Sequence, residues 1–240
     1  MSTVNTGWIE LPTPAGPMRA YSALPAGRGR LPGLMVFQEA FGVNHHIRDV
    51  AERFAQEGFV VVAPELYHRT AAPGFECGYG DFAAVAPHRQ GITPQGLADD
   101  ARACWDWLQA NPRVDRERIA CVGYCLGGRT AFVANTALPF RAAVSYYGGG
   151  LVPDLIQRAP DLRAPMLFFW GGQDPHIPPE HVRAAAEALR AAKKPFVNVE
   201  VSDAGHGFFC DEREAFNPAA ARESWALTLA FLREKGAWKR

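Results

Sequence analysis

The chain has 240 residues, a length that one α/β domain can accommodate, so we expect a single domain over residues 1–240. Hydrophobic residues make up 48% of the chain, and Lys plus Arg equal Asp plus Glu at 25 each. This composition is typical of a folded protein without net charge. A neutral chain gives no reason to expect nucleic acid or an anionic membrane as partner, so the expected partner is a small molecule.

Targeting and membrane signals are not visible in the sequence. The first residues lack a basic segment followed by an apolar one, and no apolar run reaches the ~18 residues that a membrane span needs. We therefore expect a cytoplasmic protein that is a monomer or a homodimer. The five cysteines are odd in number and form no C-x-x-C pair, which argues against a disulfide framework and a zinc ribbon.

The first third of the chain predicts two strands and a helix in addition to an N-terminal hairpin at the edge of the sheet. Two short antiparallel strands are expected between Trp8 and Tyr21, with a proline-rich turn between them. Apolar runs then predict strands over 33–38 and 59–63, with a helix from about 47 to 56 between them. The run at 59–63 is continuously apolar, as in a strand that is buried on both faces of a parallel sheet.

The remaining two thirds alternate strands with helices. A glycine- and proline-rich segment at 65–93 is longer than a simple connecting loop and is expected to form one wall of the active site. Thr93 and Pro94 predict the start of a helix that ends near Asn111. Further predicted elements are strand 119–122, helix 126–137, strands 142–147 and 165–170, helix 179–192, strand 197–201 and helix 219–234. This order predicts a doubly wound, mostly parallel sheet of about seven or eight strands flanked by helices.

The strongest chemical signal is the G-x-C-x-G sequence centred on Cys125, which lies between an apolar strand and a predicted helix. This is the nucleophile-elbow pattern with cysteine in place of serine. Gly123 and Gly127 would allow close backbone approach at the turn, and the dipole of the following helix would favour a thiolate. The backbone N–H of Leu126 would face the developing oxyanion. An isolated cysteine is more often an inert buried thiol, but this context favours a nucleophile.

An acid and a base follow in the order expected for such a site. Asp174 comes directly after the apolar run 166–170, and His206 lies between two glycines after the strand 197–201. Parallel strands end at the same edge of a sheet, so both side chains are expected near Cys125. The alternatives are an aspartate that caps its own turn and a hydrogen-bonded loop histidine. The combined order of nucleophile, acid and base favours the catalytic interpretation.

The other cysteines and histidines give no second site. Cys104 and Cys121 lie on predicted core faces, and Cys77 and Cys210 lie in loops. The pairs His45 and His46, and His176 and His181, lack metal-ligand spacing and have no clustered partners in the sequence. We therefore expect neither a metal nor a cofactor.

With these residues in place, the chain resembles the dienelactone hydrolase family of α/β-hydrolases from about Gln38 to the last helix. The segments that carry the resemblance are QEAFGVN at 38–44, ELYHR at 65–69, GYCLGG at 123–128, YYGGG at 146–150, GGQDPHIP at 171–178 and AGHGF at 204–208. The resemblance implies the α/β-hydrolase fold, with Cys125 as nucleophile, Asp174 as acid and His206 as base.

The resemblance also implies roles for residues outside this triad. Glu39 matches a carboxylate that pairs with the cysteine in the resting enzyme and swings away when substrate arrives, although a glutamate that favours a helix N-terminus is the alternative. The N–H of Ala40 matches the second oxyanion donor. The residues expected to line the substrate pocket are Phe41, Tyr67, His88, Arg89, Tyr147 and Phe208.

The chain departs from the family where the substrate carboxylate is bound. Family members carry a serine directly after the histidine and an arginine three residues later, whereas this chain has Gly207 and Cys210. We expect this guanidinium to be missing. The family's other carboxylate-binding arginine falls in the stretch 74–91, where Arg89 or His88 could substitute for it. The expected function is hydrolysis of an ester or lactone through an acyl-thioester. The alternatives are a carboxylesterase or thioesterase acting on a neutral acyl group, and a non-catalytic binding module.

Overall fold

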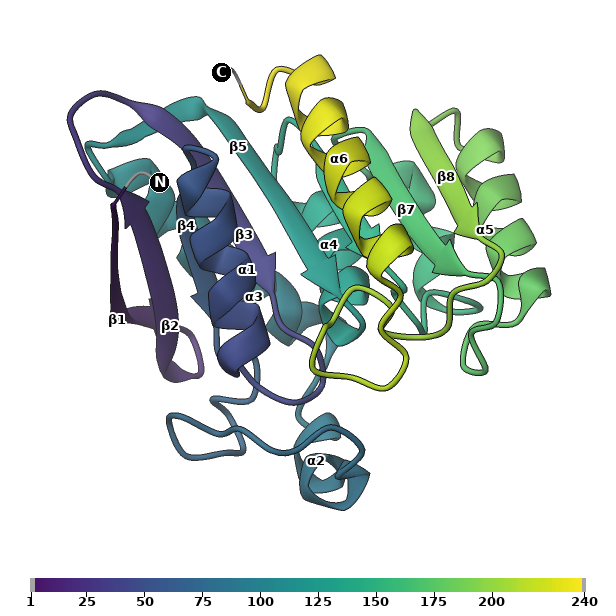
Figure 1. Cartoon of the computed structure of the whole chain (residues 1–240). Coiled ribbons are helices and arrows are strands. Elements are labelled where there is room, and N and C mark those ends of the chain that lie inside the picture. The colour runs from purple at the N-terminus through teal and green to yellow at the C-terminus, as the bar shows by residue number, and fades with distance from the viewer. Residues whose placement is uncertain (1–2, 239–240) are drawn as a thin grey trace.

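A computed structural model describes residues 3–238 as one eight-stranded sheet with helices on both faces (Figure 1). The strands are β1 (Val4–Thr13), β2 (Gly16–Pro25), β3 (Leu31–Phe37), β4 (Val60–Pro64), β5 (Val114–Tyr124), β6 (Ala143–Tyr146), β7 (Met166–Gly171) and β8 (Phe196–Val201). The helices are α1 (His45–Gln56), α2 (Phe82–Arg89), α3 (Pro94–Ala110), α4 (Leu126–Ala137), α5 (Pro179–Ala191) and α6 (Pro218–Glu234), with a 3-10 helix at Leu155–Asp161.

The sheet has the order β1-β2-β4-β3-β5-β6-β7-β8. The hairpin β1-β2 is antiparallel and pairs antiparallel with β4, whereas every pairing from β4 to β8 is parallel. The predicted doubly wound, mostly parallel sheet is therefore confirmed. Because the parallel strands end at the same edge, the loops after β3, β5, β7 and β8 meet there (Figure 1).

The helices bury their apolar stripes against the two faces of the sheet. α1 and α6 lie on the viewer's side in Figure 1, and α3 and α4 lie behind the sheet. In α1 the buried side chains include Ile47, Val50 and Phe54, which recur at helical spacing. The side chain of Asn44 caps this helix by accepting a hydrogen bond from the N–H of Ile47. Each such buried apolar side chain contributes about 1.5–3 kcal/mol relative to an exposed one.

Two elements and part of a third were not predicted. The segment 65–93 contains α2, and the chain after β6 contains the 3-10 helix Leu155–Asp161. α2 buries only Val85, so its sequence lacks an apolar stripe. β5 begins at Val114 rather than near 119, because its first residues pair with Leu31 and Pro32 ahead of a register shift. That early part of β5 is largely exposed and has no apolar run.

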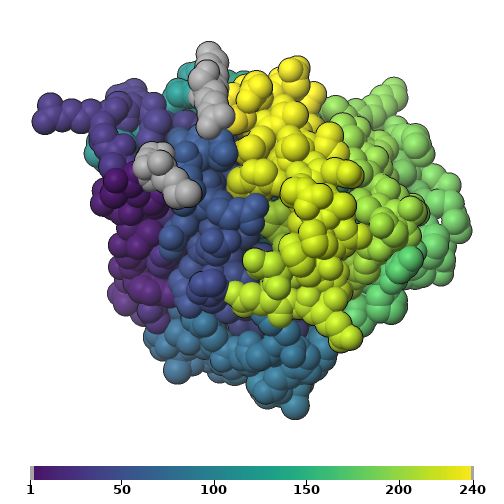
Figure 2. Space-filling view, in the orientation of Figure 1, coloured from purple at the N-terminus to yellow at the C-terminus, as the bar shows by residue number. Residues whose placement is uncertain are grey.

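The segment 65–93 covers the edge of the sheet at which the parallel strands end. In the space-filling view it forms the blue surface below α1 (Figure 2). Gly42 and Glu76 form an isolated antiparallel bridge, so the segment is attached to the loop after β3. Among residues 3–238, no helix combines the length and the apolar character that crossing a membrane would require.

Candidate active site

The turn from β5 into α4 holds Cys125 in a strained conformation. Its φ is 54° and its ψ −114°, a region that residues with a side chain rarely adopt. A Cβ atom at Gly123 would lie 1.9 Å from the carbonyl oxygen of Gly127, and one at Gly127 would lie 2.1 Å from that of Phe37. Both glycines are therefore required sterically, and the elbow is locked against the end of β3.

Two backbone amides beside this turn are free to bind an anion. Leu126 begins α4, and Ala40 lies in the loop after β3. Over residues 3–238, neither N–H donates a hydrogen bond to the protein. The hydroxyl of Tyr67 donates to the carbonyl oxygen of Ala40 at 3.1 Å and fixes that loop. Ala40 and Leu126 both pack on a small apolar cluster of Phe41, Tyr67 and Val85.

The loops after β7 and β8 bring Asp174 and His206 together. Nδ1 of His206 lies 2.7 Å from Oδ2 of Asp174, and the other carboxylate oxygen accepts from the N–H of His176 at 2.8 Å. Both side chains are buried. A Cβ atom at Gly171 would lie 2.6 Å from the carbonyl oxygen of Ala204, so the absence of a side chain there lets the two loops approach.

His206 also interacts with the thiol of Cys125. Burial by itself lowers the pKa of His206, but hydrogen bonds and charges from Asp174 and Cys125 together outweigh it and raise the pKa to about 10. The ring of Tyr147 lies 5.1 Å from that of His206 and covers it edge-on. The structure thus places His206 between Asp174, to which it is hydrogen-bonded, and Cys125, whose charge acts on it. That the three residues form a catalytic triad stays a prediction.

Glu39 pairs with an arginine rather than with the thiol. Its carboxylate is fully buried, and Oε1 accepts from Nη1 of Arg213 at 3.0 Å. The other oxygen, Oε2, has no hydrogen-bond partner among the described residues. The contact with Cys125 that the resemblance implies for the resting enzyme is therefore not present in this conformation. Its role as a gate stays a prediction.

Arg213 corrects the expectation that this loop lacks a guanidinium. Gly207 has a φ of +84°, and a Cβ atom there would lie 2.4 Å from Nη1 of Arg213. The glycine after His206 therefore makes room for an arginine from farther along the loop. Arg213 also lies over the rings of Phe41 and Tyr79, 5.6 Å from each centroid. No spacing rule indicates such a replacement, and this explains why the sequence did not reveal it.

Comparisons with known proteins give the family of the chain. The profile of the dienelactone hydrolase family matches residues 18–236. The chain belongs to that family.

Relatives of this family member cover almost its whole length. A protein from Salmonella typhimurium, named as a candidate carboxymethylenebutenolidase, is 36% identical over 98% of this chain and 90% of its own length. A protein with the same name from Escherichia coli K12 is 36% identical over 97% of this chain and 88% of its own length. The crystal structure of a candidate dienelactone hydrolase from Klebsiella pneumoniae has a TM-score of 0.89 at 32% identity and covers 96% of this chain and 99% of its own. The fold is thus the α/β-hydrolase fold.

The pocket residues predicted for this family member fall into two groups. Phe41 and Tyr67 are buried beside Ala40 and Leu126, and Tyr147 is buried beside His206. Phe208 is also fully buried, but its ring packs on Tyr147 and on the core residue Tyr146.

The other two predicted pocket residues are on α2. His88 is half-buried, with its ring 5.7 Å from that of Tyr67, and its Nδ1 lies 3.1 Å from the hydroxyl of Thr70. Arg89 is exposed at the end of the helix. Its charge affects the pKa of Tyr67, which burial raises above its ordinary value.

Arg129 is a second arginine that the sequence analysis did not single out. It lies one turn after Cys125 on α4, and its Nε is buried without a hydrogen-bond partner among residues 3–238. Burial lowers its pKa, as does the neighbouring charge of Arg89, while Cys125 and Tyr67 act in the opposite direction. The signal was present in the sequence, because residues four apart share a helix face.

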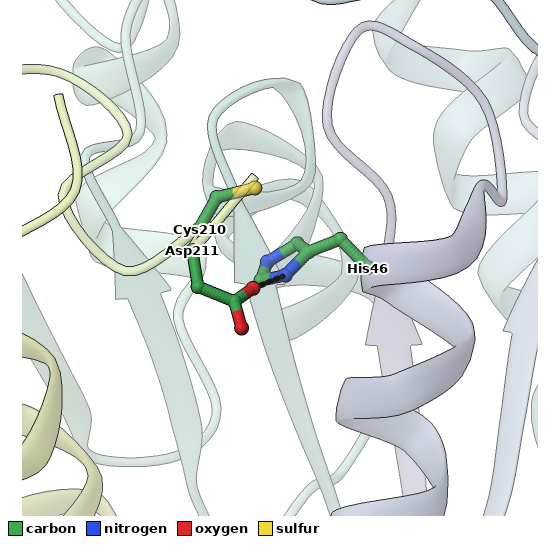
Figure 3. Close-up of side chains that lie close together, drawn as sticks. All are labelled: His46, Cys210 and Asp211. Carbon is green, nitrogen blue, oxygen red and sulfur yellow. Dashed lines mark ion pairs between the residues drawn. The ribbon is translucent and has the colours of Figure 1, made fainter. Parts of the chain in front are cut away.

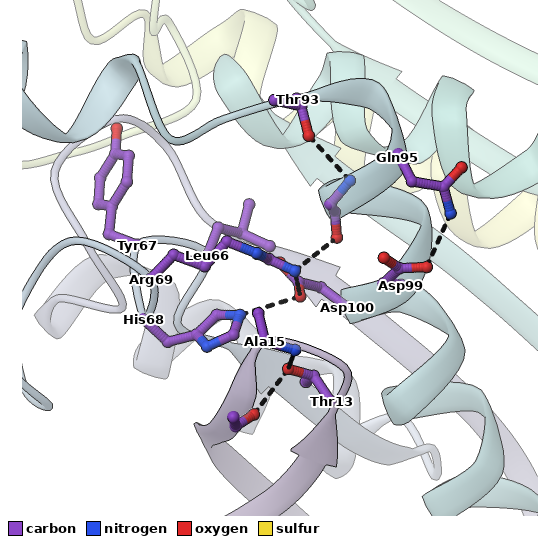
Figure 4. Close-up of polar contacts among 12 residues, drawn as sticks. Thr13, Ala15, Leu66, Tyr67, His68, Arg69, Thr93, Gln95, Asp99 and Asp100 are labelled. Atoms are coloured by element: carbon purple, nitrogen blue, oxygen red, sulfur yellow. Dashed lines mark hydrogen bonds and ion pairs between the residues drawn. The ribbon is translucent and has the colours of Figure 1, made fainter.

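The family segment ELYHR is anchored to α3 by a buried carboxylate (Figure 4). Asp100 is fully buried and accepts two hydrogen bonds of 2.8 Å from the guanidinium of Arg69. Nε2 of His68 lies 3.0 Å from the same carboxylate. In Figure 4 both side chains point at Asp100 from neighbouring positions of the chain. This clamp holds Tyr67 in place beneath the loop of Ala40.

Proposed function

We propose that this hydrolase of the dienelactone hydrolase family cleaves an ester or lactone bond with Cys125 as nucleophile, by way of an acyl-thioester. The observation that carries the proposal is the contact of His206 with both Asp174 and the thiol of Cys125, at a turn whose strain exposes the nucleophile. A strained nucleophile beside an oriented base is the arrangement that acyl transfer requires.

Acylation begins when His206 holds the proton of Cys125 and the thiolate attacks the carbonyl carbon. The carbonyl oxygen becomes an oxyanion, which the N–H groups of Leu126 and Ala40 stabilise; each donor of this kind contributes about 3 kcal/mol. His206 then gives its proton to the leaving alkoxide or enolate. The C–S bond has formed and the C–O bond has broken, so the acyl group is held as a thioester.

Hydrolysis of the thioester reverses these roles. The thioester carries no charge, so the part of the raised pKa of His206 that comes from Cys125 disappears. The imidazole can then accept a proton from water, while Asp174 keeps it oriented at 2.7 Å. The resulting hydroxide attacks the acyl carbon, the thiolate leaves, and a carboxylic acid is released.

We propose a small lactone or ester with its own carboxylate as substrate, as in the carboxymethylenebutenolide after which relatives are named. Arg129 supports this, because its buried guanidinium has an unpartnered Nε close enough to Cys125 and Tyr67 to interact with their charges. Arg89 adds a second positive charge in the same place. Guanidinium groups bind carboxylates in a planar, often bidentate geometry.

A neutral acyl substrate is the second candidate. It is favoured by the pairing of Arg213 with Glu39, since a guanidinium already bound to a buried carboxylate is not free to bind another. Arg129→Gln distinguishes the two substrate classes.

The test of the chemistry is a panel of lactones and esters with and without a carboxylate, hydrolysed by the wild type and by Cys125→Ala. We expect Cys125→Ala to lower kcat/KM by at least ~10³-fold. Cys104→Ala is the control, because Cys104 is buried in the core on α3 and should leave the rate of the folded enzyme unchanged. Equal rates for the wild type and Cys125→Ala would disprove the mechanism.

The test of the substrate class uses Arg129→Gln on the same panel. If Arg129 anchors a carboxylate, KM for the carboxylated members rises by about 10-fold or more, while the neutral members are unaffected. Equal effects on both kinds would favour the neutral acyl substrate.

A further inference from the structure

A second group of ligand-type side chains lies outside the proposed triad. His46, Cys210 and Asp211 each offer one possible ligand atom, and these three atoms lie within 4.8 Å of one another. His46 is in the first turn of α1, and the other two are in the loop between β8 and α6. Figure 3 shows the imidazole reaching from α1 toward this loop. The fold thus assembles a set that the sequence, which suggested no metal site, could not reveal.

His46 is the feature that requires an explanation. It is 1% exposed, and neither ring nitrogen has a hydrogen-bond partner among the described residues. Its closest charged neighbour is the carboxylate of Asp211, 3.7 Å from Nδ1, which is too long for a hydrogen bond. Leaving a buried polar group unpaired costs about 1–3 kcal/mol. A ligand that bonds to the ring would remove this cost.

The electrostatic surroundings of His46 favour a cation. Neither nitrogen of the buried ring is engaged by the protein among the described residues, so a lone pair is available to a metal ion. The charges that act on His46 include four carboxylates, Glu39, Asp211, Glu212 and Asp49, of which Glu39 is paired with Arg213.

Cys210 adds a soft donor to the group. It is fully buried, and burial raises the pKa of its thiol to about 12. Its Sγ lies 3.2 Å from the hydroxyl of Tyr79, which also accepts from the side-chain amide of Asn44 at 2.9 Å. This leaves the Tyr79 hydroxyl able to donate its own hydrogen to a thiolate, and such outer partners stabilise ligating groups.

We propose that His46, Cys210 and Asp211 bind a borderline divalent transition-metal ion, of which Zn²⁺ is the representative. Nitrogen, sulfur and oxygen donors together suit such ions and not Mg²⁺ or Ca²⁺, which prefer oxygen alone. In a tetrahedral zinc site the ligand atoms lie about 3.5 Å apart, close to the 3.7 Å between His46 and Asp211. A water molecule would complete the coordination.

Solvent reaches the site from the side of Asp211. The side chain of Asp211 is 66% exposed and lines a surface hollow with Phe209 and Trp225. Arg53 and Arg222 line the same hollow. Binding breaks the S–H bond of Cys210, forms a sulfur–metal bond and releases one proton to solvent. The thiolate and the carboxylate then balance the charge of the ion.

The experiment is a titration of the chelator-treated full chain with Zn²⁺ and with Co²⁺, in the Cys125→Ser background so that the catalytic thiol cannot bind metal. We expect one ion per chain and one proton released per ion, measured by calorimetry in buffers of different ionisation enthalpy. Co²⁺ should give the near-ultraviolet charge-transfer absorption of a thiolate ligand. Mg²⁺ should give no binding.

Substitutions at the proposed ligands test which side chains bind the metal ion. Cys210→Ser should abolish the charge-transfer absorption, and Asp211→Asn should weaken Zn²⁺ binding at least ~10-fold. Asp211→Asn changes an exposed side chain, so it keeps the test valid if Cys210→Ser fails to fold. Cys77→Ser is the matched control and should bind as tightly as the parent.

Three results would overturn the proposal. They are no binding at micromolar Zn²⁺, equal binding by the parent and Asp211→Asn, and a charge-transfer absorption that survives Cys210→Ser.

Discussion

Glu39 and Asp100 are both fully buried carboxylates paired with arginine, but they differ in how completely they are bonded. Both oxygens of Asp100 are engaged by Arg69, and His68 adds a third contact. Only Oε1 of Glu39 is engaged, by Arg213, and its Oε2 has no partner among the described residues.

The difference separates a structural carboxylate from one that can move. A completely bonded buried group has no alternative position of similar energy, so Asp100 anchors the chain beside it. A group with one free oxygen retains bonding capacity for a second partner, and the arginine that pairs with Glu39 is close enough to Cys125 for their charges to interact. Four predictions test this comparison, from the largest expected effect to the smallest.

Asp100→Asn should lower the free energy of unfolding by about 3 kcal/mol, because it leaves Arg69 and His68 without their buried counter-charge. Urea denaturation measures the change. Asp99→Asn is the control, since Asp99 accepts a hydrogen bond from the exposed side chain of Gln95, and it should change stability by less than about 0.5 kcal/mol. A small loss for Asp100→Asn would mean that the clamp is not structural.

Gly207→Ala should cost about 2 kcal/mol, because its φ of +84° strains a residue with a side chain and the added Cβ would displace Arg213 from Glu39. Chemical denaturation together with activity measurements would show both effects. At Gly78 a Cβ atom meets nothing within 4 Å, so Gly78→Ala should change neither. Equal behaviour of the two variants would contradict the proposed packing.

Glu39→Gln should cost only about 1 kcal/mol, because an amide oxygen can still accept from Arg213. Its effect should instead be on reactivity. Removing a negative charge while Arg213 stays in place favours the thiolate, so iodoacetamide should label Cys125 faster at pH 7. Glu117→Gln, at an exposed site, is the control. An unchanged labelling rate would show that the Glu39 carboxylate does not affect the reactivity of the Cys125 thiol.

The last prediction concerns titration rather than loss of structure. The raised pKa of His206, about 10, should fall in Cys125→Ser because the contributions of the thiol are removed. Protonation of a group with a raised pKa stabilises the fold fully below its unfolded value of about 6.5 and ceases to do so as the pH rises through the folded pKa. In the variant, this stabilisation should therefore be lost at a lower pH. NMR of the imidazole measures it, and an unchanged pKa would refute the contact.

Most elements of the fold could be predicted because each is encoded locally. Helix α4 has the predicted bounds, since it follows the elbow directly and ends where its apolar pattern ends. The positions of Asp174 and His206 could be predicted because each follows its own apolar strand, and their hydrogen bond agrees with that prediction.

What could not be predicted depends on packing between distant segments. Arg213 reaches Glu39 only because Gly207 lacks a side chain, and no pattern along the chain encodes that approach. His46 meets Cys210 and Asp211 only once α1 and the loop before α6 lie together. The helix α2 was missed because it buries a single side chain.

The small buried area of α2 affects which part of the molecule unfolds locally. The chain from Glu65 to Cys77 is fixed at several points, including hydrogen bonds from the N–H of Gly74 to the carboxylate of Glu65 and from that of Cys77 to the carbonyl of Phe41. Beyond them α2 is held by the buried side chain of Val85 and by ring contacts of the partly exposed His88 and Phe82. Segments with so little burial unfold locally at the lowest free energy. Amide hydrogens of α2 should therefore exchange first, and Arg89 would leave the substrate's surroundings with them while Arg129 remains.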